Sequence, residues 1–260
     1  MCRWLAYVGK PRSVEGLVYG GAHSLSHLAL HSFEARLGVQ GDGGGLGWYN
    51  HLPDPGLYRN SGPAWADPNL REISRHVESR ITFAHIRASS GAPDLFVNCH
   101  PFRHGPWLFM HNGQIGGFAA LRRDLLGLLT DQAFAALQGG TDSELILQLM
   151  VSHGLDRDPA TALRDVTQMI EARRQAAGIE VPFNATFALT DGWRFWAVRW
   201  ASDGQPPTLY RTEGEDYVLL VSEPLDEDVS RWTEVPPNSL VSLQLAPDWS
   251  RAARSETFLD

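Results

Sequence analysis

Cys2 is the residue of this sequence whose type and position most clearly suggest catalytic chemistry. Its side chain is small, and a small residue in second position permits removal of the initiator methionine. Removal of Met1 would leave Cys2 with a free α-amine beside its thiol, so one residue would hold both a nucleophile and a proton acceptor. The reference pKa of an α-amine is about 7.7–8.0, so a useful neutral fraction exists near pH 7. The alternative is a cysteine that packs at the start of a strand without a catalytic role.

Polar motifs also follow two predicted strands. The predicted strand 80–86 ends in the motif His85-Ile86-Arg87-Ala88-Ser89, and the predicted strand 107–110 is followed by His111-Asn112-Gly113. Strand ends join a rigid scaffold to loops, and catalytic and binding residues concentrate there. We therefore expect a site where these two strand ends lie close together.

Two other motifs have simpler interpretations. His23, His27 and His31 would share one helix face, but no acidic or cysteine partner lies nearby in the sequence to complete a tetrahedral set. We therefore expect no metal site. The glycine-rich run 41–47 lacks the spacing and the Lys-Ser/Thr ending of a phosphate-binding loop. It indicates close approach of backbone segments ahead of a strand.

Composition and charge exclude several classes of function. The chain has 260 residues, and its 43% hydrophobic content is sufficient for a substantial core. A net charge of −8 without a basic cluster argues against nucleic-acid binding. No apolar run approaches ~20 residues, and no leader precedes the first strand, so we expect neither a membrane span nor a signal peptide. Two cysteines, Cys2 and Cys99, favour a reduced cytoplasmic protein over a disulfide-bonded one.

The elements that would position these residues are strands at both ends of the chain and helices in the middle. Asp158-Pro159 is a typical helix start, and Thr141 with Glu144 has the form of a capping box. Asp191-Gly192 predicts a hairpin with a two-residue turn, and the Pro-, Gly- and Asp-rich segment 51–68 predicts a surface loop. Helices are expected at 13–19, 69–77, 118–129, 141–150 and from 158 onward. Strands are expected at 4–8, 46–50, 80–86, 107–110, 187–190, 193–197, 208–211, 217–221 and 239–245.

Taken in order, the motifs resemble the class II glutamine amidotransferases. This resemblance implies an α+β fold, the four-layer αββα sandwich of the N-terminal nucleophile hydrolases. It assigns residues 1–260 to one such domain, with the strand-rich remainder as its second half. The matching segments, within roughly the first 150 residues, are Met1-Cys2-Arg3, 41–47, His85-Ile86-Arg87, Asn98-Cys99-His100-Pro101-Phe102, His111-Asn112-Gly113 and Thr141-Asp142-Ser143-Glu144.

The resemblance also implies catalytic roles. Cys2 would attack the γ-carbonyl of glutamine or of a γ-glutamyl amide, and its α-amine would carry the proton to the leaving nitrogen. The side-chain amide of Asn112 and the backbone N–H of Gly113 would stabilise the oxyanion. Losing one such donor typically costs ~3 kcal/mol of transition-state stabilisation.

Substrate binding follows from the same resemblance. Arg87 offers the planar fork that binds a carboxylate bidentately, and Asp142 offers an anion for the ammonium group of the substrate. His111 and Ser89 complete the expected substrate-binding set. No cofactor is expected.

Three functions are compatible with these residues. The leading one is a free-standing amidohydrolase of γ-glutamyl compounds, because the chain has no room for a fused ammonia-accepting domain. The second is a glutaminase subunit that supplies ammonia to a separate synthase. The third is a catalytically silent protein that binds a glutamate-like ligand, which retention of Met1 would favour. For the first, we expect the loop 51–65 with Trp48 and Tyr49 to contact the amine portion, so that bulky amides are preferred over glutamine.

Overall fold

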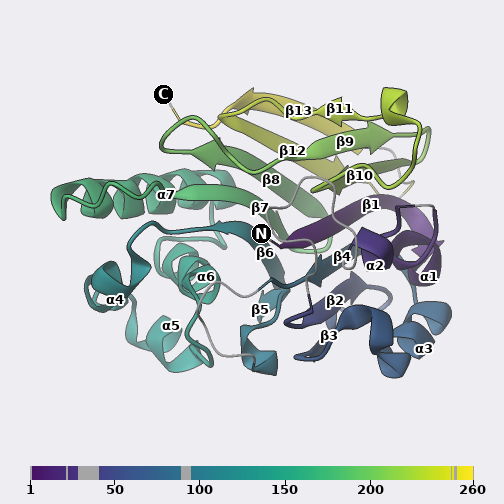
Figure 1. The fold of residues 1–260 in the computed structure, drawn as a ribbon, viewed down its shortest axis with the longest axis horizontal. Coiled ribbons are helices and arrows are strands. Elements are labelled where there is room, and N and C mark those ends of the chain that lie inside the picture. Colours follow the sequence, from purple (N-terminus) through teal and green to yellow (C-terminus); the bar gives the residue numbers. More distant parts are fainter. Residues whose placement is uncertain are drawn as a thin grey trace.

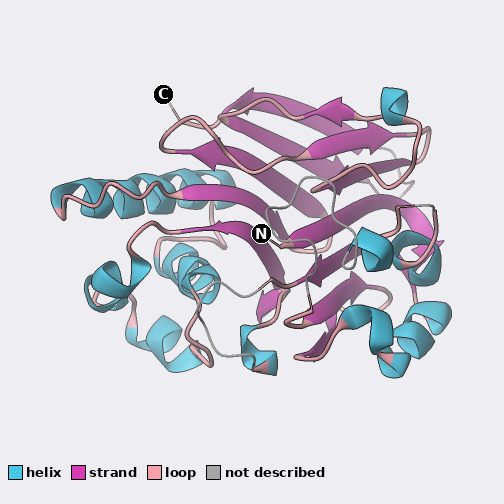
Figure 2. Ribbon diagram, viewed as in Figure 1, coloured by secondary structure: helices cyan, strands magenta, loops and turns pink. Residues whose placement is uncertain are grey.

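The computed structural model describes residues 2–21, 23–28, 41–88, 95–246, 248 and 251–259, with the backbone alone at 251–253. Two antiparallel sheets lie between two groups of helices, which gives four layers (Figure 1). Colouring by secondary structure separates the central strands from the helices on either side (Figure 2). The predicted αββα sandwich is therefore confirmed.

The first sheet holds the N-terminal strand at its centre, in the order β11-β9-β10-β1-β4-β2-β3. Three helices pack on its outer face: α1 (Val14–Val18), α2 (Leu25–Leu28) and α3 (Pro68–His76). The strands are β1 (Arg3–Ser13), β2 (Gly44–Tyr49), β3 (Gly56–Asn60), β4 (Glu78–Ile86), β9 (Tyr210–Glu213), β10 (Tyr217–Val221) and β11 (Thr233–Glu234).

The second sheet has the order β13-β12-β8-β7-β6-β5. Its strands are β5 (Phe102–His104), β6 (Trp107–Gln114), β7 (Asn184–Thr190), β8 (Arg194–Ala201), β12 (Ser239–Leu245) and β13 (Arg251–Thr257). The helices on its side of the molecule are α4 (Phe118–Leu126), α5 (Asp131–Ala136), α6 (Asp142–Ser152) and α7 (Pro159–Ala176). Short 3₁₀ turns lie at Ala64–Ala66, Phe96–Asn98 and Val229–Arg231. Among the described helices, none is long and apolar enough to cross a membrane.

Side-chain alternation along the central strands decides which residues meet between the sheets. In β1, Trp4 is buried between the sheets, whereas Leu5 packs under α1 to α3. In β6, Met110 lies between the sheets, whereas Phe109 packs under the helices of the other side. Burial of each such large side chain stabilises the fold by roughly 1.5–3 kcal/mol.

The helix starts follow the sequence signals, with one difference. The Asp158 carboxylate accepts a hydrogen bond from Thr161 N at 3.1 Å, which caps α7 as expected. Thr141 caps α6 by accepting from Glu144 N at 3.1 Å. The Glu144 carboxylate does not complete a capping box, because it accepts instead from the backbone N–H groups of Gln138 and Gly139.

Several expected boundaries were wrong. The segment 51–68 contains β3, so it is not a continuous loop. The hairpin turn between β7 and β8 spans the three residues 191–193, not two. Strand β6 does not stop at residue 110 but runs through His111-Asn112-Gly113 to Gln114. Of the histidines expected to share a helix face, His31 lies outside the described residues, and α2 is only four residues long.

Candidate active site

A cavity of about 630 Å³ opens where the start of β1 meets the ends of β4 and β6. These strand ends lie side by side in the middle of the molecule (Figure 1), so the expected meeting of the two strand ends is confirmed. The predicted site residues that line the cavity are Cys2, Arg87, His111, Gly113 and Asp142. Ser89 lies outside the described residues.

The thiol of Cys2 sits against the backbone of Ala88, just beyond β4. Ala88 N donates to Cys2 Sγ at 3.3 Å, and Sγ lies 3.5 Å from Ala88 O. Burial raises the pKa of the thiol, and the Ala88 N–H offsets only part of that increase. A thiol with a raised pKa needs a base to become a nucleophile. Both Cys2 and Cys99 are free cysteines.

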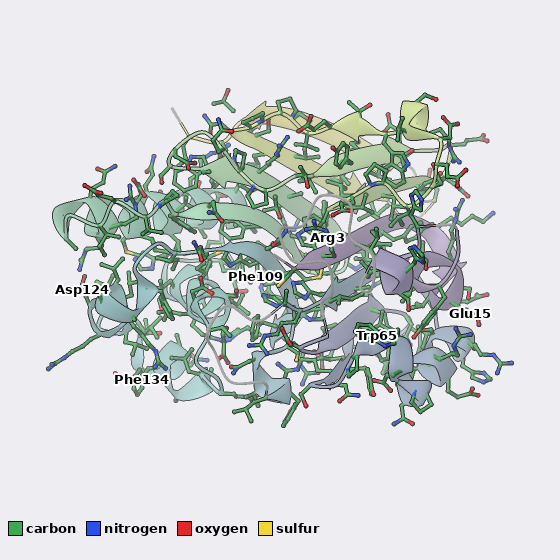
Figure 3. The ribbon with its side chains drawn as sticks, in the orientation of Figure 1. Arg3, Glu15, Trp65, Phe109, Asp124 and Phe134 are labelled. Carbon is green, nitrogen blue, oxygen red and sulfur yellow. The ribbon has the colours of Figure 1, made fainter. Side chains whose placement is uncertain are left out.

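The side chain of Arg3 holds the backbone at the start of β1. The buried guanidinium of Arg3 forms an ion pair with the buried carboxylate of Glu223, and Arg3 Nη1 donates to Cys2 O at 2.9 Å. Figure 3 shows Arg3 in the middle of the molecule, whereas Asp124 of α4 lies at its margin. Chain termini commonly fray, but these contacts hold Cys2 in a defined position.

Arg87 is held by the glycine-rich segment that precedes β2. Its backbone N–H donates to Gly43 O at 2.8 Å, and Arg87 Nη1 donates to Asp42 O at 3.1 Å. Gly43 has a φ of 119°, and a Cβ there would lie 2.5 Å from Cys99 Sγ. Only glycine fits this position, so the close backbone approach expected of the segment 41–47 is confirmed.

Asp142 begins α6 and ties it to the chain that leaves β6. Asp142 Oδ2 accepts from Ile115 N at 2.9 Å, and Asp142 Oδ1 accepts from Ser143 N at 2.8 Å. Each carboxylate oxygen can accept a second hydrogen bond, so Asp142 retains capacity for a cationic ligand in the cavity.

His111 lies beside this carboxylate as part of the cavity wall. His111 Nδ1 is 3.0 Å from Ser143 Oγ, and its other ring nitrogen is 3.4 Å from Asn184 O. Burial lowers the pKa of His111, although the nearby Asp142 carboxylate opposes the change. A neutral imidazole at this position contributes shape and hydrogen bonds to the wall.

Of the two expected oxyanion donors on β6, Gly113 lines the cavity, whereas Asn112, the residue before it, is not among the lining residues. Asn112 is buried, and its side-chain amide has no hydrogen-bond partner among the described residues. An unpaired buried amide costs about 1–3 kcal/mol, so a hydrogen bond from this group to a bound ligand would offset that cost. Gly113, the next residue, lines the cavity with a φ of 148°, and a Cβ there would lie 2.0 Å from Asn184 O.

A stacked pair of histidines lies next to these residues and was not predicted. The rings of His85 and His100 are 4.1 Å apart and buried, and their nitrogens have no partner in the described part of the chain. Burial lowers the pKa of His85 to about 3 and that of His100 well below its usual value. No cluster of three or more His, Cys, Asp or Glu side chains within the described residues could hold a metal ion.

Two further buried residues hold the loop before α6 against the cavity, and sequence reasoning gave them no such role. Asn98 Oδ1 accepts from Gly140 N at 3.0 Å, and the Glu144 carboxylate accepts from Gly139 N at 2.7 Å. A Cβ at Gly139 would lie 2.3 Å from Asn98 Oδ1, so the loop must be glycine there. Both residues belong to motifs that the sequence displays, but only the fold reveals what they hold.

The expected wall for the amine portion of a substrate was wrong. None of Trp48, Tyr49 and the loop 51–65 lines the cavity, and Tyr49 is buried between the sheets. The outer wall comes instead from α4 and the segment before β7. Its residues include Phe118, Ala119, Ala120, Arg122 and Val181.

The buried histidines make stability sensitive to acid. The folded protein protonates His85 only near pH 3, whereas an unfolded chain does so near pH 6.5, so acidification through this window favours unfolding. Between pH 7 and pH 5, His85 should therefore remove about 2 kcal/mol from the free energy of unfolding. His85→Phe keeps an aromatic ring against His100 and should reduce the pH dependence by that amount in urea unfolding at both pH values. An identical pH dependence in parent and variant would contradict this reasoning.

Comparison with known proteins identifies the family. The family model described as "Glutamine amidotransferases class-II" matches residues 21–203. "Probable glutamine amidotransferase DUG3" of Saccharomyces cerevisiae is 30% identical, over 94% of this chain and 82% of that protein. "Gamma-glutamyl-hercynylcysteine sulfoxide hydrolase" of Mycolicibacterium smegmatis is 28% identical, over 94% and 96%.

Solved structures agree with this assignment. A glutamine aminotransferase class-II domain protein from Silicibacter pomeroyi gives a TM-score of 0.76 at 30% identity, with both chains covered completely. The glutamine phosphoribosylpyrophosphate amidotransferase of Bacillus subtilis shares the fold, with a TM-score of 0.67 at 15% identity, over 99% of this chain and 49% of that one. The chain belongs to the class II glutamine amidotransferase family.

Proposed function

We propose that the protein is a free-standing hydrolase of γ-glutamyl amides in which Cys2, after removal of Met1, is the nucleophile. One observation carries the proposal: a single cavity is lined by the Cys2 thiol, the Arg87 guanidinium and the Asp142 carboxylate. The two charges complement the zwitterionic end of a glutamyl group, and the thiol complements its γ-carbonyl. The Mycolicibacterium relative is named as a hydrolase of a γ-glutamyl compound, which supports this class of substrate.

Binding orients the substrate before any bond is broken. Arg87 accommodates the α-carboxylate through the planar fork of its guanidinium, which the glycine-rich segment holds at Asp42 O. Asp142 accepts hydrogen bonds from the α-ammonium. With both ends of the amino acid held, the γ-carbonyl is presented to Cys2, which lowers the entropic part of the barrier.

Hydrolysis then proceeds in two steps on Cys2. The α-amine removes the thiol proton, Sγ attacks the γ-carbonyl carbon, and the oxyanion accepts hydrogen bonds from the Asn112 amide and the Gly113 N–H. Collapse of this intermediate breaks the C–N bond, and the proton held by the α-amine passes to the leaving nitrogen. Water attacks the resulting thioester with the α-amine as base, and glutamate is released.

The first test removes the nucleophile. Cys2→Ala should lower kcat/KM for γ-glutamyl amides by at least ~10³-fold, because no other group can form the thioester. The Tm should stay close to that of the parent, since one small, partly buried thiol contributes little packing.

Site-directed labelling provides the matching control. A diazo-ketone analogue of glutamine should alkylate Cys2 and spare Cys99, which is buried and contacts Asn60 O. Full activity of Cys2→Ala, or alkylation of Cys99 instead, would rule out the proposed mechanism.

The second test separates the two ends of the glutamyl group. Arg87→Lys keeps the charge but loses the bidentate fork, so kcat/KM should fall about tenfold for substrates with a free α-carboxylate. Asp142→Asn should lower kcat/KM for substrates with a free α-amine and have less effect on N-acetylated ones. An equal loss for free and N-acetylated substrates would show that Asp142 does not bind the ammonium.

The outer wall suggests the chemistry of the amine portion. Arg122 is exposed on α4 and lines the cavity, and within the described residues it forms no ion pair. The charges assigned to the glutamyl group are already matched by Arg87 and Asp142. We therefore propose that preferred substrates carry an anionic group on the amine portion, as γ-glutamyl amino acids do, and that Arg122 pairs with it.

A substrate panel tests this preference. Arg122→Ala should lower kcat/KM about three- to fivefold for γ-glutamyl amino acids, as expected for an exposed ion pair, and leave their carboxamide counterparts unaffected. Arg123→Ala is the matched control, because it removes the neighbouring exposed cation, which does not line the cavity. If glutamine is the best substrate and Arg122→Ala affects all substrates alike, the specificity proposal fails while the Cys2 mechanism can stand.

A further inference from the structure

The proposed catalytic groups are divided between the two sheets. Cys2 precedes β1 of the first sheet, whereas Asn112 and Gly113 belong to β6 of the second. The space between the sheets is filled mainly by apolar side chains, such as Phe83 and Met110. Apolar burial stabilises the stacking but is not directional, so it cannot by itself fix the separation of a nucleophile and an oxyanion donor.

A buried series of hydrogen bonds connects the two sheets near these groups. The indole N–H of Trp4 donates to Thr186 Oγ1 at 3.0 Å, and Thr186 Oγ1 donates to Asn112 O at 3.4 Å. Each of the three residues is at most 1% exposed. Thr186 is also the residue of β7 directly opposite Asn112 in the β6–β7 pairing. These hydrogen bonds therefore connect Trp4, two positions after Cys2, to the backbone of Asn112, the proposed oxyanion donor.

Trp4, where this series of hydrogen bonds begins, is itself held firmly. Trp4 N donates to Ser222 Oγ and Ser222 N donates to Trp4 O, both at 3.0 Å. Arg3, the residue between Cys2 and Trp4, is paired with Glu223. Because the backbone on this side cannot shift freely, the hydrogen bonds to Thr186 transmit its position to Asn112.

We infer that Trp4 and Thr186 are positioning residues that set the separation between the Cys2 thiol and the oxyanion donors. The inference rests on the proposed function, and it adds a pair of residues to which that mechanism assigns no part. Enzymatic rates depend steeply on such geometry, and a misplacement of 1 Å can cost on the order of 10²-fold. Loss of the Thr186 hydroxyl should therefore act on kcat and not on substrate binding.

The protein contains a matched hydrogen bond away from the site. The Tyr49 hydroxyl of β2 lies 2.5 Å from Pro106 O and 3.2 Å from Thr190 O, so it also joins the first sheet to β7. It is buried, and it does not line the cavity. Tyr49→Phe thus removes buried hydrogen bonding between the sheets and leaves the hydrogen bonds of Trp4 and Thr186 in place.

The experiment compares Thr186→Val, Trp4→Phe, Thr186→Ser and Tyr49→Phe in the full-length, Met1-processed enzyme. For Thr186→Val and Trp4→Phe we expect kcat to fall about tenfold with KM within about twofold of the parent. Thr186→Ser restores the hydroxyl and should recover most of kcat. Tyr49→Phe should lower the Tm to a similar extent as Thr186→Val but keep kcat within about twofold of the parent.

An unchanged kcat in Thr186→Val would overturn the inference, and so would an equal loss of kcat in Tyr49→Phe at equal loss of Tm. Crystal structures of the parent and Thr186→Val give a readout that does not depend on turnover, namely the separation of Cys2 Sγ and Asn112 Nδ2. We expect that separation to change in the variant, and an unchanged separation would also overturn the inference. A parent enzyme that cleaves no γ-glutamyl substrate would count against the proposed function, and the structural comparison would still decide the role of Thr186.

Discussion

The buried ion pair between Arg3 and Glu223 is the interaction on which the site depends. Both side chains are at most 2% exposed, and the same guanidinium donates to Cys2 O. Burial of two charges carries a desolvation cost that their attraction only partly offsets, so such a pair is weak evidence of added stability. Its effect here is positional, because it fixes the first residues of the chain in the middle of the sandwich, where the proposed nucleophile Cys2 must be held.

Apolar packing and directional hydrogen bonds occupy different parts of the molecule. Apolar side chains fill the space between the sheets and under both groups of helices, whereas directional hydrogen bonds concentrate where the strands end. Arg87 is tied to Asp42, Asp142 to Ile115, and the loop before α6 to Asn98. Most charged and polar groups at the cavity therefore have a structural partner already, which leaves them preorganised for a ligand.

Local signals predicted the elements that local forces stabilise. The cap at Asp158 and the apolar run that begins β1 were readable because each depends on neighbouring residues. Strand β3 was missed because its Pro- and Gly-rich surroundings resemble a loop, and β13 because an edge strand can be rich in charge. The assignment of all 260 residues to one domain of this type stays a prediction. The position of α4 over the cavity could not be predicted from the sequence, because it follows from tertiary packing. For the same reason, the cavity wall for the amine portion of the substrate was wrongly assigned to Trp48 and Tyr49.

We propose that Cys2, as the first residue of the mature chain, forms the covalent intermediate. The most direct test is peptide mass spectrometry of the active enzyme after turnover of a γ-glutamyl amide is quenched with acid. We expect an N-terminal peptide that begins at Cys2 and carries one glutamyl group in thioester linkage. An active enzyme whose N-terminal peptide retains Met1, or a glutamyl group found on Cys99 instead, would contradict it.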